Sequence, residues 1–140
     1  MSAIGTVMTA NPASCRPDAP IAQVAQLMID HDCGQIPVVD AEGKPVGVVT
    51  DRDIAVRLVA TGKSDATAAD AMTTPCQSVR TDGNVQDAVR MMEANKIRRV
   101  PVVDGDGRLA GIVSIADLAL AGKQEATAEV VKQVSEPGSK

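Results

Sequence analysis

The sequence predicts an α/β protein made of two β-α-β-β-α repeats, and three observations support this fold class. First, residues 36–40 and 100–104 have nearly the same sequence, and the two segments lie 64 residues apart. Second, each copy contains apolar residues at the spacing of one helix face. Third, each copy contains two short runs rich in β-branched residues, which are typical of strands. The match extends without a gap from about residues 8–56 to residues 72–120.

Each repeat is expected to begin with a short extended piece and an amphipathic helix. The extended pieces are residues 14–16 and 78–80. One helix face carries Ile21, Val24, Ala25 and Met28 in the first copy, and Val85, Ala88, Val89 and Met92 in the second. Asp18 is the expected N-cap of the first helix, and Asp82 or Asn84 that of the second.

Two strands and a second helix are expected to complete each repeat. The strands are residues 36–39 and 46–49 in the first copy, and residues 100–103 and 109–113 in the second. The turns between them, residues 40–43 and 104–107, contain Asp and Gly, which favour tight turns. The second helix is expected over residues 51–62 and again over residues 114–122, since Gly often ends a helix.

This pattern divides the chain into four segments. Residues 4–62 form the first repeat, 63–71 a linker, 72–122 the second repeat and 123–140 a tail. The Ala-, Thr- and Asp-rich linker is compatible with a short helical turn, and the tail is expected to be partly helical with a frayed end. A unit of about 50 residues buries too little surface to fold securely alone, so the two repeats are expected to share a core.

Composition and charge exclude several classes of function. The 140 residues carry a formal net charge of −4, and nucleic acid, which needs a basic surface, is therefore not an expected partner. No apolar stretch approaches the roughly 20 residues that cross a bilayer, and the first ten residues do not resemble a secretory signal. The protein is therefore expected in the cytoplasm, with no membrane partner. The three cysteines form no CxxC pair, which favours reduced thiols over structural zinc.

One motif occurs in both copies where a strand leads into a helix. Residues 47–53 and 111–117 both read Gly-apolar-apolar-Thr/Ser-x-x-Asp. The hydroxyl and carboxylate of the motif belong to Thr50 and Asp53 in the first copy, and to Ser114 and Asp117 in the second. One interpretation is structural, since such a pair forms a capping box. The other is functional, since a helix N-terminus attracts phosphate and an Asp one turn on can accept hydrogen bonds from the two hydroxyls of a ribose.

The repeat unit, the Ile/Val-Pro-Val-Val-Asp strand and the duplicated motif resemble the CBS domain, named for cystathionine β-synthase. Two tandem copies form a Bateman module, and the resemblance covers about residues 4–121. It implies a stand-alone pair of CBS domains with pseudo-twofold symmetry, with the sheets packed together and the helices outside. It also implies a non-catalytic regulatory module that binds an adenine nucleotide (AMP, ADP, ATP or a related adenosyl ligand) in the cleft between the repeats.

The resemblance also implies roles for individual residues. Ribose is held by Asp53 and Asp117, ribose or phosphate lies near Thr50 and Ser114, and adenine packs against Ile36 with Pro37 and against Val100 with Pro101. The chain has no Phe, Tyr or Trp, so a planar base must pack between aliphatic side chains or against Arg.

Arg98 and Arg99 precede the second Pro-Val-Val strand, at a place where basic residues of the family often contact phosphate. Their counterparts in the first copy are Gly34 and Gln35, so the two sites are not equivalent. At most one site is therefore expected to bind phosphate strongly. The alternative is that the two arginines form a solvated strand edge that deters aggregation. Arg52 has two equal interpretations, a phosphate contact or a surface ion pair.

No set of residues fills the roles that catalysis needs, so no catalytic residue, metal site or required cofactor is expected. His31 is expected at the surface, at a helix end. A regulated protein would be a separate chain or a dimer partner. The alternative function is a ligand-independent dimerisation or interaction scaffold. For a homodimer, the expected apolar face consists of Ile54, Leu58, Val59 and Leu118 on the second helices.

Overall fold

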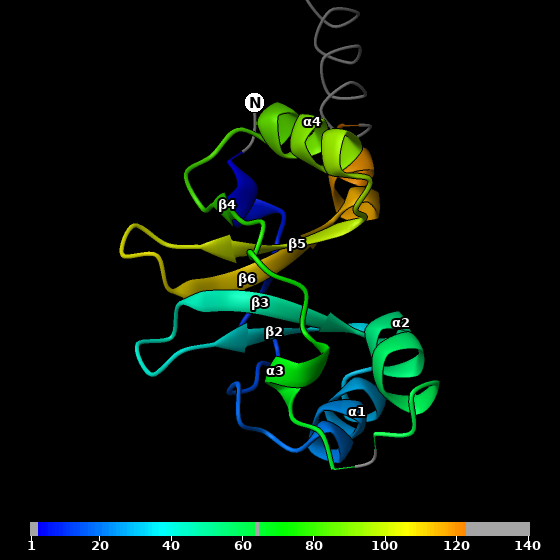
Figure 1. Ribbon diagram of the computed structural model, residues 1–140. Helices are drawn as coiled ribbons and strands as arrows, with labels where there is room; N and C mark the ends of the chain where they lie inside the picture. The colour runs from blue at the N-terminus through cyan, green and yellow to red at the C-terminus, as the bar shows by residue number, and fades with distance from the viewer. Residues whose placement is uncertain (1–2, 64, 123–140) are drawn as a thin grey trace, which may run out of the picture.

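The structure, a computed structural model, describes residues 3–63 and 65–122; the predicted tail, residues 123–140, lies outside this described part. The α/β architecture is confirmed. The strands of the two halves meet in the middle of the molecule, with α1 (Ile21–Asp30) and α2 (Asp51–Asp53) at one end and α4 (Val85–Asn95) at the other (Figure 1). The helices thus lie outside the packed strands, as the family resemblance implies.

The first half consists of α1, an antiparallel hairpin and a second helical segment. The strands are β2 (Gln35–Val39) and β3 (Pro45–Thr50), and the helical segment is α2 followed by the π-helical η2 (Ile54–Val59). Ile21 and Val24 are buried on the inner face of α1, in agreement with the predicted apolar stripe. β3 leads into α2 without a loop, so Thr50 ends the strand and is also the N-cap of the helix. The first motif therefore lies at a strand-to-helix corner, as predicted.

The second half repeats this plan 64 residues later. Its elements are β4 (Val79–Arg80), α4, β5 (Arg99–Val103), β6 (Leu109–Ser114) and a helix over residues 115–122. β5 and β6 pair in the same register as β2 and β3, since Pro101 faces Ile112 as Pro37 faces Val48. The predicted helices and hairpins of both repeats are therefore confirmed within the described residues.

The N-cap prediction is right for α4 and wrong for α1. Asn84 Oδ1 accepts a hydrogen bond from the amide of Gln86 at 2.7 Å. α1 begins after Pro20 rather than Asp18, and Pro20 offers no side-chain acceptor. The amide of Ile21 instead donates to the carbonyl of Ala66 at 3.0 Å. The free amide at this end of α1 is thus paired through a tertiary contact, which the local sequence does not reveal.

The two halves exchange their leading segments. η1 (Ile4–Thr6) and β1 (Thr9–Ala10) lie at the start of the predicted first repeat but pack on the second half, where β1 pairs antiparallel with β6. In the same way α3 (Ala68–Ala71), a helical turn in the predicted linker, packs on the first half, and Thr73 bridges to Val48. Each core therefore contains a segment of the other repeat. The exchange was not predicted from the sequence, and the repeat boundaries stay predictions.

The motif glycines allow the exchanged segments to approach the strands. A Cβ atom at Gly111 would lie 2.7 Å from the carbonyl oxygen of Thr9, and one at Gly47 would lie 2.9 Å from that of Thr73. Real Cβ contacts are essentially never this short, so any larger residue would push the segment away. The glycine of each motif therefore has a packing role, separate from any ligand.

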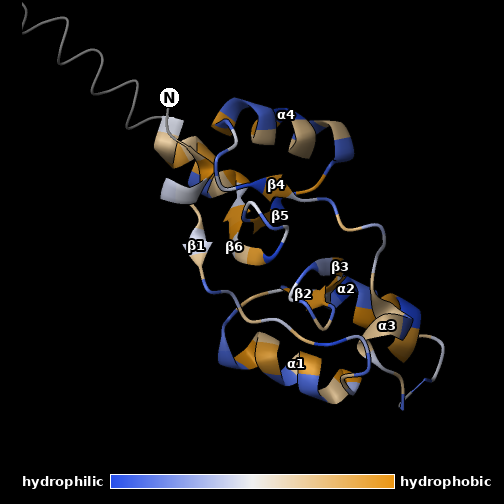
Figure 2. Cartoon of the chain, turned by 90° about the vertical axis from the view of Figure 1, so that its left-hand side faces the viewer, coloured by the Kyte–Doolittle hydropathy of each residue, from blue (hydrophilic) through white to orange (hydrophobic). Residues whose placement is uncertain are grey.

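The second helices bury two of the four residues that were expected to form a dimer face. Aliphatic side chains fill one core in each half, and α1 and α4 show alternating hydrophobic and hydrophilic residues (Figure 2). Leu58 and Leu118 are only 1% and 2% exposed because they belong to these cores, so that part of the expected face is wrong. Val56, Val59 and Leu120 are the apolar residues that these helices expose. Among the described residues, no helix combines the length and apolar character that a membrane span requires.

Candidate functional site

A pocket of about 360 Å³ lies between the two halves, a size that suits a small molecule. Its walls are Arg99, Ile112, Ser114 and Asp117 from the second half, His31, Cys33 and Gln35 from the first half, and Thr9, Asn11, Pro12 and Ala13 from the segment that crosses between them. Because β1 pairs with β6, Thr9 lies opposite Ile112 at this crossing. The pocket therefore lies in the cleft between the repeats, where the family resemblance implies a ligand.

Ser114 and Asp117 form the polar corner of this pocket. The amide of Asp117 donates to Ser114 Oγ at 3.0 Å, and the amide of Ser114 donates to Asp117 Oδ2 at 3.1 Å. These two bonds confirm the structural interpretation of the motif as a capping box. They leave Asp117 Oδ1 without a hydrogen bond to any described residue, while Asp117 lines the pocket. The carboxylate can therefore cap the helix and accept a hydrogen bond from a ligand at the same time.

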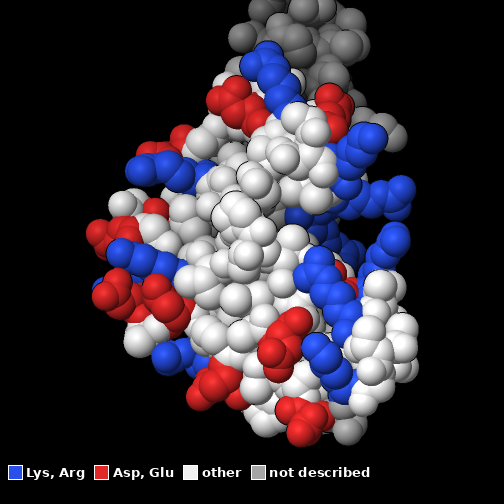
Figure 3. Space-filling view, in the orientation of Figure 1, with Lys and Arg blue, Asp and Glu red and all other residues white. Residues whose placement is uncertain are grey.

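Arg99 brings a positive charge to the pocket from the first residue of β5. It lies opposite Ser114 in the ladder between β5 and β6, so the cation and the capping corner are neighbours. On the same edge of the molecule, where β3 enters α2 and β5 begins, Lys and Arg side chains gather around a hollow (Figure 3). The pocket therefore contains the negative carboxylate of Asp117 and the positive guanidinium of Arg99. A ligand with hydroxyl donors at one end and an anionic group at the other matches these two charges.

The residues that the first half contributes to the pocket were missed in the sequence. His31 is exposed at the C-cap of α1, as predicted, and it also lines the pocket. Gln35 lies 64 residues before Arg99, and this offset is the one sequence signal that could have identified it. Its Oε1 atom is buried and has no hydrogen-bond partner among the described residues. The pocket is therefore assembled from both repeats rather than from one motif.

The crossing segment was missed for a different reason. Asn11 has a φ of 52°, a left-handed conformation that Asn tolerates, and it turns the chain from the second half toward the first. Pro12 and Ala13 follow and give the pocket an apolar wall. Asn-Pro marks a turn in the sequence. Nothing local, however, indicates that this turn packs against a strand about 100 residues away in the chain.

Several predicted site residues lie outside the pocket. Thr50 and Asp53 form the matching capping box of the first half, with both bonds at 3.0 Å, but they do not line it. The residues expected to contact adenine, Ile36, Pro37, Val100 and Pro101, are all buried on β2 and β5. Ile36 and Val100 belong to the two separate cores. None of the four lines the pocket, and their contact with adenine stays a prediction.

The remaining predicted cations are exposed and stay predictions. Arg98 is exposed and does not line the pocket, although its carbonyl accepts from the amide of Ile115 at 2.8 Å. Arg52 is also exposed, and its side chain forms no ion pair with a described residue. Within residues 3–63 and 65–122, no group of three or more His, Cys, Asp or Glu side chains could hold a metal ion.

Burial distinguishes the three thiols, none of which is in a disulfide. Burial raises the pKa of the Cys15 thiol and of the Cys76 thiol, each to about 11. Both therefore remain protonated at neutral pH and are poor nucleophiles. Cys33 lines the pocket, where a ligand would cover it.

Comparison with known proteins connects this site to a family. A family model for the CBS domain matches the chain twice, over residues 4–60 and 68–123. The chain is 39% identical over 121 residues to the CBS domain-containing protein YhcV of Bacillus subtilis. The aligned residues cover 86% of this chain and 85% of that protein. It is 32% identical over 117 residues to an uncharacterized protein of Methanopyrus kandleri. These aligned residues cover 82% of this chain but only 60% of that protein.

Two solved structures have the same fold. CBSX2 of Arabidopsis thaliana, crystallised in complex with AMP, has a TM-score of 0.78 and 29% identity, covering 90% of this chain and 99% of that one. The CBS domain pair of protein MJ0100, in complex with 5′-methylthioadenosine and S-adenosyl-L-methionine, has a TM-score of 0.79 and 28% identity, covering 89% of this chain and 98% of that one. The chain therefore belongs to the CBS-domain family, as a tandem pair of CBS domains.

Proposed function

We propose that this chain binds an adenine nucleotide, or a related adenosyl ligand, in the pocket between its halves, and that binding regulates rather than catalyses. The observation that carries the proposal is the Ser114–Asp117 corner, which keeps a carboxylate oxygen for a ligand in a pocket that also contains Arg99. The adenosyl class is supported by the similar structures, which hold AMP, 5′-methylthioadenosine and S-adenosyl-L-methionine. These three ligands share an adenosine or thioadenosine unit.

The pocket residues suggest how such a ligand would bind. The two ribose hydroxyls are neighbouring donors, and Asp117 Oδ1 is an acceptor within the pocket. Arg99 can pair with a phosphate through two parallel hydrogen bonds. The base packs against the apolar surfaces of Pro12, Ala13 and Ile112, because the chain has no aromatic ring to stack on. Ile36, Pro37, Val100 and Pro101 do not line this pocket, and their contact with adenine stays a prediction.

The proposal assigns no reaction to the pocket. His31 and Cys33 both line the pocket, and no hydrogen bond joins them in the part of the chain that the structure describes. A ligand held by Asp117 on one half and by the first half on its other side would instead strengthen the contact between the halves. A separate regulated protein would respond to that change. Homodimerisation stays a prediction, with Val56, Val59 and Leu120 as the exposed apolar residues available for it.

Calorimetry with AMP, ADP, ATP and S-adenosylmethionine tests the proposal. At least one of these ligands should give saturable heat and raise the melting temperature, because a ligand that binds only the folded state stabilises it. 2′-Deoxy-AMP is the matched control, since it lacks one of the two hydroxyls assigned to Asp117 and should bind more weakly than AMP. No heat and no thermal shift with any ligand at millimolar concentration would overturn the proposed function.

Alkylation of the thiols provides a second prediction. With iodoacetamide at pH 8, Cys33 should react first, because it lines the pocket, whereas the thiols of Cys15 and Cys76 have pKa values raised to about 11. A pKa three units above the pH leaves only about one thiolate in a thousand, so both should react slowly until the pH approaches 11. Saturating AMP should slow the alkylation of Cys33 alone, as measured by peptide mass spectrometry. Equal protection of all three thiols would instead indicate general stabilisation, and an unprotected Cys33 would place AMP elsewhere.

A further inference from the structure

The two capping corners have the same backbone geometry but different surroundings. At the first corner, Asp53 and Thr50 exchange two hydrogen bonds of 3.0 Å, and at the second corner Asp117 and Ser114 exchange bonds of 3.0 and 3.1 Å. A ligand that recognises only the motif would therefore bind both corners. The difference lies in what covers the carboxylate.

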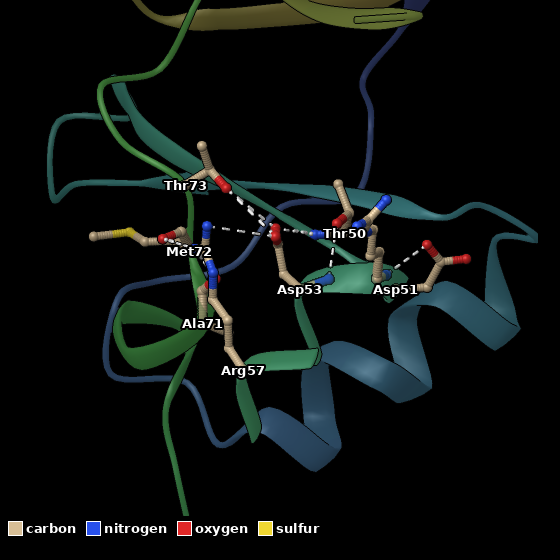
Figure 4. Close-up of polar contacts among 8 residues, drawn as sticks. Thr50, Asp51, Asp53, Arg57, Ala71, Met72 and Thr73 are labelled. Carbon is tan, nitrogen blue, oxygen red and sulfur yellow. Dashed lines mark hydrogen bonds and ion pairs between the residues drawn. The ribbon is translucent and has the colours of Figure 1, made fainter. Parts of the chain in front are cut away.

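The carboxylate of Asp53 is covered by the protein's own side chains (Figure 4). Thr73 Oγ1 lies 3.4 Å from both carboxylate oxygens of Asp53, and Arg57 Nη2 lies 3.9 Å from its Oδ1. As a result, the side chain of Asp53 is only 13% exposed. Both oxygens already have polar neighbours within the chain.

Arg57 is held in this place by a second set of contacts. Its Nη1 atom donates to the carbonyl oxygens of Ala71 and Met72, both at 2.9 Å. These carbonyls lie at the C-terminal end of α3, where a helix presents unpaired carbonyl groups to a cation. Arg57 therefore connects η2, the end of α3 and the motif carboxylate. It is not a loose surface side chain that a ligand could displace at no cost.

The second corner lacks the corresponding cation. The residue 64 positions after Arg57 is Ala121, which has no donor and cannot reach Asp117 with a charge. The counterpart of Thr73 is Thr9, which lines the pocket without a hydrogen bond to Asp117 among the described residues. Asp117 thus lies in a pocket, whereas Asp53 lies beneath an ion pair.

We propose that Arg57 is a built-in cation that closes the first corner and limits the chain to one nucleotide. The inference rests on the proposed function, because it assumes that the motif carboxylate recognises ribose. For a ribose to reach Asp53, its hydroxyls must replace Thr73 Oγ1 and the guanidinium, whose other bonds to Ala71 and Met72 keep it in position. The sequence duplicates the motif, and Arg57 adds to the difference that Arg99 and its counterpart Gln35 already make between the two copies.

The experiment measures the stoichiometry of AMP binding by calorimetry in the full chain. The wild type should bind one AMP, and Asp117→Ala should remove it. Arg57→Ala should bind two AMP molecules, one at each corner. The double variant Arg57→Ala/Asp117→Ala should bind one AMP, at the first corner. Adding Asp53→Ala to the double variant should remove that AMP as well. Arg90→Ala is the matched control, since it removes an arginine from an exposed ion pair with Asp87 on α4 and should leave the stoichiometry at one.

The outcomes separate the two proposals. If Arg57→Ala still binds one AMP, or if the wild type already binds two, the closing role of Arg57 is overturned. If the wild type binds neither AMP nor ADP, ATP or S-adenosylmethionine, the proposed function fails. Arg57 is then judged by whether Arg57→Ala gains binding that depends on Asp53. Weaker binding in Arg57→Ala would make the arginine a ligand contact and also overturn the inference. Arg57→Gln, which retains an amide donor for the α3 carbonyls, repeats the test if Arg57→Ala melts early.

Discussion

Replacing Asp117 with Ala should weaken AMP binding by roughly 100-fold or more, because two hydrogen bonds to a charged acceptor are lost. Each such bond contributes about 1.5–3 kcal/mol, and about 1.4 kcal/mol corresponds to a factor of ten in affinity. The carboxylate lines the pocket and keeps Oδ1 for a ligand. Calorimetry of the wild type and the variant, at the same pH and salt concentration, measures the difference.

Asp53→Ala is the matched control for this prediction. Both substitutions remove a capping carboxylate, since Asp53 Oδ2 accepts from Thr50 at 3.0 Å and Asp117 Oδ2 accepts from Ser114 at 3.1 Å. Each should therefore reduce the free energy of unfolding by about 1 kcal/mol for the lost cap, and Asp53→Ala also loses the contacts with Thr73 and Arg57. Only Asp117→Ala should lose affinity. An equal loss of affinity in both variants would mean that helix capping, and not contact with ribose, determines binding.

Replacing Ile4 with Ala should have the largest effect on stability, lowering the free energy of unfolding by about 2–5 kcal/mol. Ile4 is 1% exposed and belongs to the core of the second half, although it begins the predicted first repeat. Its segment is fixed there by hydrogen bonds from the Ile4 amide to Gly83 at 3.1 Å and from the Gly5 amide to Thr81 at 2.9 Å. Urea denaturation measures the effect.

Ile29→Ala is the matched control, because it makes the same Ile-to-Ala change at a surface position. Ile29 is 73% exposed on α1. It should change the free energy of unfolding by no more than about 0.5 kcal/mol. If Ile4→Ala were as mild as Ile29→Ala, the leading segment would not be part of the second core. The pocket wall that the following residues form would then lose its support.

The duplicated pattern was sufficient to predict the helices and hairpins of both halves. Side-chain periodicity identifies α1, α4 and the strands because each element buries one face or one run of aliphatic residues locally. The capping boxes at Thr50 and Ser114 were also predictable, since their partners are three residues away in the chain. Local patterns of this kind depend on short sequence separation and are therefore visible in the sequence alone.

Contacts between distant segments could not be predicted in the same way. The exchange of the leading segments depends on β1 pairing with β6, across about 100 residues. For the same reason Asn11, Pro12 and Ala13 were not recognised as pocket residues, and Ala66 was not recognised as the partner that completes the start of α1. Arg57 follows Asp53 by four residues, a spacing that the sequence shows, but its bonds to Ala71 and Met72 depend on how η2 packs against α3.

A crystal structure of the chain grown with saturating AMP would show where the nucleotide binds. We expect electron density for AMP between the halves, with the ribose hydroxyls within hydrogen-bonding distance of the Asp117 carboxylate and the phosphate beside Arg99. AMP bound at the Asp53 corner, or an unaltered pocket at saturating AMP, would contradict this expectation.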